Sequence, residues 1–91
     1  MKKIPDNVSR YAATPEFAET TAPQHLLDSH ETKPGVWAKI VVLEGTLRYC
    51  ILGAEAEEHE LTPDRPGVAE PEVPHRVEIT GPARFQLELY R

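Results

Sequence analysis

The sequence has little of what several classes of protein require. A single cysteine, Cys50, excludes an internal disulfide and a cysteine-based zinc ribbon. The longest apolar run, 40–43, is far too short to span a bilayer, so no membrane segment is expected. Basic residues number 10 against 15 acidic ones, which argues against a surface built for nucleic acid or anionic lipid. No apolar stretch follows the lysines at positions 2 and 3, so we expect no export signal and a cytoplasmic protein.

Turn-forming residues divide the chain into short pieces. Nine prolines and five glycines recur every few residues, and no segment between them is long enough for an ordinary core helix. The intervening runs are rich in Val, Ile, Leu, Tyr and Phe, which is typical of strands. We therefore expect one all-β domain over residues 1–91, an antiparallel barrel or sandwich. The exception is one helical turn over 23–28, where Pro23 suits the first position.

Two apolar runs predict a hairpin. Residues 36–43 and 46–52 are separated by Glu44-Gly45, a spacing that suits a two-residue turn in which glycine supplies positive φ. Pairing across this turn gives one apolar face: Ala38, Ile40, Val42, Leu47, Tyr49 and Ile51. The opposite face is mixed and carries Trp37, Lys39, Val41, Arg48 and Cys50. The apolar face should pack into a core, and the mixed face should remain partly exposed to solvent.

The C-terminal third predicts two more strands, joined by a turn at 80–82. Alternation places His75, Val77 and Ile79 on the interior face of the first strand. Phe85, Leu87 and Leu89 share the interior face of the second. The acidic stretch 55–60 is expected to be a solvated loop, and His25 and His59 are expected at the surface.

His75 allows two interpretations. A single histidine on an apolar face is usually a core residue bonded to a backbone carbonyl. The proline-rich segment 67–74, however, delivers His75 rigidly at the start of a strand, as a ligand would need. A second histidine, His30, lies just before the predicted hairpin.

Several motifs together resemble a known family. They are Tyr11 with Thr14-Pro15, the stretch from His30 to Trp37, Gly45, Glu70-Pro71, His75 to Glu78, and Phe85 with Tyr90. This pattern resembles the TehB/YeaR-like domain, a small cupin family associated with tellurite resistance and found alone or fused to a methyltransferase. The resemblance covers essentially the whole chain. It implies a small cupin-like antiparallel β-barrel of jelly-roll type, open at one end.

The resemblance also implies a metal site, from which this chain departs in two places. Thr32 stands where the general cupin pattern has its second histidine, and Ala38 where it has a glutamate. His30 and His75 remain as ligands for Zn²⁺, Fe²⁺, Mn²⁺ or Ni²⁺, with Glu70 as the expected third donor. Glu78 and Glu88 fall on outward faces. The pocket around these ligands is expected to include Thr32, Lys33, Ala38, Tyr49 and Arg76.

Two functions remain open. The first is a metal-dependent protein that binds a small molecule, such as an anion, in oxyanion stress. Whether it is an enzyme stays open, and no catalytic residue is assigned. The second is a metal-free accessory module that binds a ligand or another protein. No Gly-rich phosphate loop is present, so no nucleotide cofactor is expected. Cys50 has no neighbouring feature that would activate a thiolate. Burial of the mixed face against a second copy predicts a homodimer.

Overall fold

The computed structural model describes all 91 residues except the side chain of His25, so the surface position expected for that side chain lies outside the described residues. Its elements are β1 (Arg10–Ala13), β2 (Phe17–Ala18), α1 (Gln24–Leu27), β3 (Trp37–Ile51), β4 (Glu57–Leu61), β5 (Gly67–Ala69) and β6 (His75–Tyr90). The expectation of an all-β, antiparallel fold is confirmed, with α1 as the expected helical turn behind Pro23. No described helix is long and apolar enough to cross a membrane.

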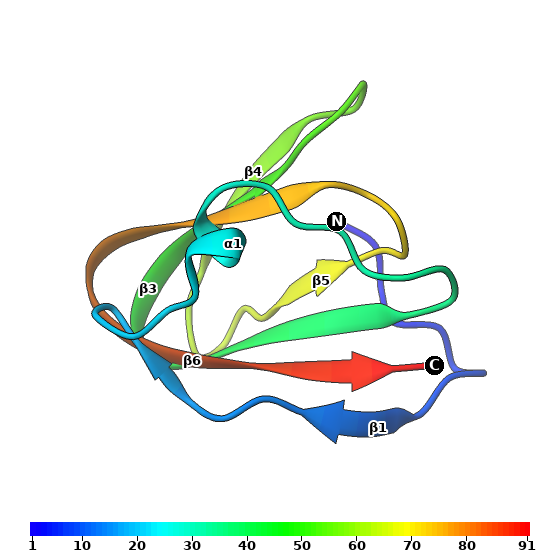
Figure 1. Cartoon of the computed structure of the whole chain (residues 1–91), viewed down its shortest axis with the longest axis horizontal. Coiled ribbons are helices and arrows are strands. Elements are labelled where there is room, and N and C mark those ends of the chain that lie inside the picture. Colours follow the sequence, from blue (N-terminus) through cyan, green and yellow to red (C-terminus); the bar gives the residue numbers. More distant parts are fainter.

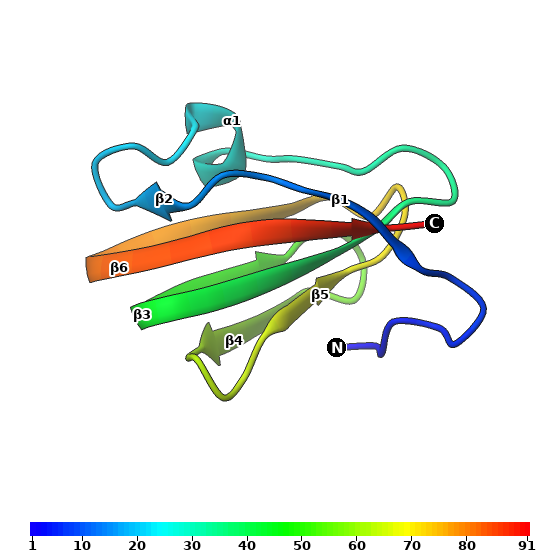
Figure 2. The same cartoon turned by 90° about the horizontal axis from the view of Figure 1, so that it is seen from below.

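Two long strands dominate the sheet. β3 has 15 residues and β6 has 16, and they pair antiparallel along their whole length, from Trp37 opposite Tyr90 to Ile51 opposite His75. The strand order is β1-β6-β3-β4, so β6 runs between β1 and β3 (Figure 1). The short strand β2 also pairs with β6, and β5 pairs with β3. Seen from below, the two long strands lie side by side through the middle of the molecule (Figure 2).

Both predicted hairpin turns are wrong. Glu44-Gly45 lies inside β3 and pairs with Arg84 and Ala83 of β6. Residues 80–82 lie inside β6 at a shift of register, beyond which the two strands pair again. β3 carries one extra residue between Val42 and Glu44; farther along, β6 advances four residues while β3 advances two. Gly45 has a φ of 77°, the left-handed conformation that glycine supplies at one common type of bulge. The two glycine-containing sites are therefore bends in one long ribbon.

The predicted faces are nevertheless largely right. Ala38, Ile40 and Val42 are buried before the bend, and Leu47 and Tyr49 are buried after it. Even-numbered residues of β3 point inward before the bulge and odd-numbered residues point inward after it. A two-residue turn would have produced the same change. Cys50 is an exception, because it belongs to the expected mixed face but is only 3% exposed.

The core lies against the inner faces of β3 and β6. Its members are Leu26, Ile40, Val42, Leu47, Tyr49, Leu61, Val77, Ala83, Phe85 and Leu87. Leu26 comes from α1, which packs on β6, and Phe17 of β2 meets Phe85 edge to face with ring centroids 5.6 Å apart. The acidic stretch expected to be a loop is mostly β4, whose Leu61 is fully buried and whose His59 is half-buried. The side chain of His59, expected at the surface, is 21% exposed.

Candidate functional site

His30 and His75 lie side by side, although they belong to different parts of the sequence. His75 is the first residue of β6, and His30 lies in the segment between α1 and β3. The His30 N–H donates to the His75 carbonyl (2.8 Å), and the His75 N–H donates to the His30 carbonyl (2.9 Å). Their rings meet edge to face, with centroids 5.4 Å apart. This reciprocal pair fixes the two backbones relative to each other.

The His75 imidazole is held in one orientation. The side chain is 4% exposed, Nδ1 lies 3.1 Å from the Val73 carbonyl oxygen, and the ring packs against Tyr49 with centroids 5.8 Å apart. Burial lowers the pKa of His75, and the Val73 carbonyl and the charge of Glu31 oppose that change. The ring is therefore neutral at pH 7, and Nδ1 must carry the proton to donate to a carbonyl. The lone pair then resides on Nε2, the usual arrangement of a metal-binding histidine.

The expected third donor lies elsewhere. Glu70 forms an ion pair with Lys2 (Nζ to Oε1, 3.1 Å) and lines a separate pocket. Among the described side chains, no group of three or more His, Cys, Asp or Glu residues could hold a metal ion. Glu78 and Glu88 pair with arginines, as their outward positions suggested. The structure thus brings together the two histidines without Glu70.

The other expected pocket residues separate into different places. Thr32 is buried, and its hydroxyl donates to backbone carbonyl oxygens. Ala38 is buried inside the sheet, where β3 pairs with both β5 and β6. Lys33 is exposed, and Arg76 forms an ion pair with Glu78 at 2.8 Å on the outer face of the sheet. Tyr49 alone among them lines the pocket that contains Glu70.

That pocket, of about 320 Å³, is acidic and adjoins the histidine pair through shared neighbours. Tyr49 both lines it and contacts His75, and Val73 and Pro74, which directly precede His75, form part of its wall. Its carboxylates come from Glu55, Glu57, Glu70 and Glu72. The Tyr49 hydroxyl donates to the Val68 carbonyl at 3.0 Å; burial raises the pKa of Tyr49, and the charges of Glu57 and Glu70 raise it further.

The chain's own cations neutralise part of this acidic pocket. Lys2 forms an ion pair with Glu70, and the amino group of Met1 lies 2.8 Å from Glu57 Oε1. The same oxygen of Glu57 lies 2.8 Å from His59 Nε2. The expectation of a loop over 55–60 does not predict that Glu57 lines a pocket or that His59 bonds to it. The alternation of Glu58 and Glu60 with His59 and Leu61 was the available signal for a strand.

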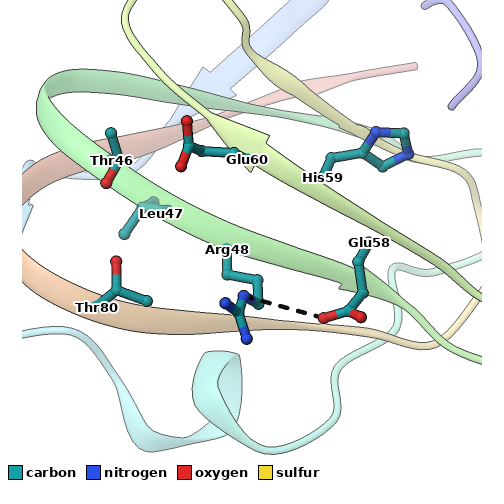
Figure 3. A pocket seen from close by; sticks show the side chains of 7 residues that line it. All are labelled: Thr46, Leu47, Arg48, Glu58, His59, Glu60 and Thr80. Carbon is teal, nitrogen blue, oxygen red and sulfur yellow. Dashed lines mark ion pairs between the residues drawn. The ribbon is translucent and has the colours of Figure 1, made fainter.

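A larger hollow of about 520 Å³ opens beside β4 (Figure 3), and neither His30 nor His75 lines it. Arg48 there forms ion pairs with Glu58 (4.0 Å) and Glu78 (3.3 Å), so its charge is already compensated. Cys50 lies farther along β3, with Sγ 3.8 Å from Glu58 Oε1. Burial raises the pKa of Cys50, which keeps it a thiol, in line with the expected absence of a catalytic thiolate.

Comparison with known proteins identifies the family. A sequence model of the TehB-like domain matches residues 12–87. The chain belongs to the TehB-like family. TehB of Haemophilus influenzae, named a probable S-adenosyl-L-methionine-dependent methyltransferase, is 38% identical over 73 residues, which cover 75% of this chain and 25% of TehB. The uncharacterized protein YeaR of Escherichia coli K12 is 35% identical over 68 residues, which cover 71% of this chain and 55% of YeaR.

Two crystal structures resemble the fold. TehB from H. influenzae superposes with a TM-score of 0.83 at 30% identity, covering 93% of this chain and 32% of that one. A protein from E. coli K12 superposes with a TM-score of 0.88 at 25% identity, covering 100% and 97%. The chain thus spans a quarter of TehB and about half of YeaR. The resemblance expected from the sequence motifs is confirmed.

Proposed function

We propose that this TehB-like chain binds a divalent metal ion through His30 and His75 and acts in the cytoplasm on small molecules of oxyanion stress. The observation that carries the proposal is the reciprocal backbone pair that holds the two imidazoles edge to face. Two protein ligands leave several coordination positions for water or a small molecule. Imidazole donors suit Zn²⁺, Ni²⁺ and Fe²⁺ better than Mn²⁺.

The environment of His75 supports a metal more than a simple hydrogen-bonding role. A neutral ring with Nδ1–H on the Val73 carbonyl has its second nitrogen ready to coordinate, because no proton need be lost at pH 7. The donor set of the described side chains is incomplete, since Glu70 is bound to Lys2 instead. Water or the bound molecule would supply the remaining donors.

Charge bears on how an anion could bind. The pocket next to His75 is lined by four carboxylates, which repel an oxyanion. The cations expected to attract an oxyanion are Lys33 and Arg76. Lys33 is exposed at the surface, and Arg76 forms an ion pair with Glu78. An oxyanion would therefore be bound by the metal ion and not by the charge of the pocket.

The test is metal analysis of the chain purified without chelators, followed by thermal unfolding with added Zn²⁺ or Ni²⁺. We expect stoichiometric metal or a clear rise in Tm in the wild type and in His59→Ala, which changes a histidine of β4. His30→Ala and His75→Gln should lose both while keeping a β circular dichroism spectrum. His25→Ala tests the remaining histidine. Metal content that survives loss of both His30 and His75 would overturn the proposal.

A second function is favoured by the size of one relative. The matching region is a quarter of TehB, so in that protein the domain is joined to a much larger remainder. The chain could serve as an accessory module for such a methyltransferase. To test this, the matching quarter of TehB would be replaced by this chain and turnover of S-adenosyl-L-methionine measured. Activity that is restored relative to truncated TehB, and that persists in the His30→Ala chimaera, would favour the accessory role over the metal site.

A further inference from the structure

Two tight turns face each other beside the histidine pair. The first covers Lys33 to Val36: the Val36 N–H donates to the Lys33 carbonyl (3.0 Å), and Gly35 has a φ of 77°. The second covers Glu70 to Val73: the Val73 N–H points to the Glu70 carbonyl (3.4 Å), and Glu72 has a φ of 63°. Proline at the second position and positive φ at the third are the signature of type II turns.

Thr32 lies between the two turns and bonds to both. Its Oγ1 lies 2.7 Å from the Val36 carbonyl oxygen and 3.3 Å from that of Glu70. A hydroxyl has one hydrogen, so Val36 at the shorter distance is its main acceptor and Glu70 the secondary one. The Thr32 carbonyl in turn accepts from the Glu72 N–H at 3.1 Å. The side chain is 9% exposed, so water competes little for these bonds.

The bonds of Thr32 and the bonds between the histidines form one continuous junction. His30 is two residues before Thr32, and His75 is two residues after the second turn ends at Val73. The His30–His75 bridge and the Thr32–Pro71 bridge are the isolated pairings that join segment 30–32 to segment 71–75. His75 itself belongs to a long paired strand, whereas His30 lies outside any strand. The junction therefore joins the backbone of His30 to that of His75.

We infer that Thr32 is a positioning residue: its hydroxyl clamps the two turns together and so holds the His30 imidazole against His75. The role of the imidazoles as metal ligands rests on the proposed function above. The clamping of the two segments does not.

A side chain that only fills space would behave differently from a clamp. Valine has nearly the shape of threonine, so Thr32→Val would keep the packing and remove only the hydroxyl. Serine keeps the hydroxyl and loses a methyl group. If packing matters, serine is the worse replacement; if the hydroxyl matters, valine is.

The experiment is native-state amide hydrogen exchange by NMR on the metal-free chain. The reporters are the N–H groups of His30, His75 and Glu72, each bonded across the junction. The reference is the buried Ile40 of β3, which pairs with both β5 and β6. Relative to Ile40, we expect the reporters to exchange about tenfold faster in Thr32→Val, the loss of about one hydrogen bond. Thr32→Ser should stay within about twofold of the wild type. Thr80→Val, at an exposed threonine, is the matched control.

The outcomes separate the clamp from the metal site. Unchanged reporters in Thr32→Val, or a loss of protection shared equally with Ile40, would overturn the inference. If Thr32→Val does not fold, Thr32→Ala against Thr32→Ser isolates the hydroxyl in the smaller side chain, with the same two results expected. Zn²⁺ binding should weaken in Thr32→Val and recover in Thr32→Ser. A wild type that binds no metal, with the exchange result intact, refutes the proposed function and leaves the clamp standing.

Discussion

Replacing Gly45 by alanine tests the bend between the two long strands. A Cβ built on Gly45 would collide with the Pro82 carbonyl oxygen, well inside the 3.0 Å within which real Cβ atoms essentially never approach another atom. The obstacle is backbone of the paired strand, so no side chain can rotate away. Gly45 also has a φ of 77°. Gly45→Ala must therefore distort the register change on which the bend depends.

The magnitude can be divided into two parts by comparing two glycines. Gly35 has the same φ of 77°, but a Cβ there meets nothing within 4 Å. Gly35→Ala should therefore cost only the left-handed strain, about 1–2 kcal/mol. Gly45→Ala adds the steric conflict, about 1–3 kcal/mol by analogy with overpacking. The expected total for Gly45→Ala is about 2–5 kcal/mol.

Urea unfolding followed by circular dichroism measures all three relevant variants. Gly81→Ala serves as the neutral control, because Gly81 lies in open space and has no positive φ. The free energy of unfolding should rank wild type and Gly81→Ala above Gly35→Ala, with Gly45→Ala lowest. If Gly45→Ala is as stable as Gly35→Ala, the close approach of Gly45 to Pro82 does not exist and the two-residue hairpin regains support.

Three further predictions concern pH, strain and assembly. Burial lowers the pKa of His75, so the folded protein favours the neutral imidazole. The contribution of that imidazole to the free energy of unfolding is fully present above pH 6.5 and is lost as the pH falls from there through the folded-state pKa. Urea unfolding gives the free energy of unfolding of the metal-free wild type and of His75→Gln at each pH. The difference between the two should fall by no more than about 1.4 kcal/mol per pH unit, and a difference that does not change with pH would contradict the prediction. Glu72→Gly should leave the free energy of unfolding unchanged or raise it by up to about 1 kcal/mol, because glycine adopts a φ of 63° without strain. If urea unfolding shows that Glu72→Gly lowers the free energy of unfolding by more than about 1 kcal/mol, the Glu72 side chain stabilises the fold. If the half-buried Trp37 and Val41 pack on a second copy, light scattering should give twice the 10.2 kDa chain mass, and a constant monomer mass across concentrations would refute the dimer.

The interior residues could be predicted from the sequence, but the strand connections could not. Alternation identified Ile40, Tyr49, Val77 and Phe85 correctly because burial on one face depends on local parity. Gly45 marks a change of parity, and a turn and a bulge produce the same change. Choosing between them requires knowing that residues 37–51 pair with 75–90, which is a contact between distant segments. Local patterns contain no information about that pairing.

The candidate site shows the same limit. His30 and His75 stood out because their flanking prolines and the family resemblance mark both segments. Glu70 was chosen for its place before the turn, but its carboxylate faces Lys2, and no spacing rule connects Glu70 to the start of the chain. The acidic composition of 55–60 concealed a strand, β4, whose Leu61 is fully buried.

The two halves of the histidine pair differ in how firmly they are held. His75 begins a strand paired with β3, whereas His30 lies outside any strand and its backbone bonds to His75 across the junction that contains Thr32. A ligand that needs both imidazoles binds only while the junction is closed. Its apparent dissociation constant is then the intrinsic value divided by the closed fraction. Substitutions that open the turns 33–36 and 70–73 should consequently weaken binding without touching the ligand, in proportion to the opening that amide exchange reports.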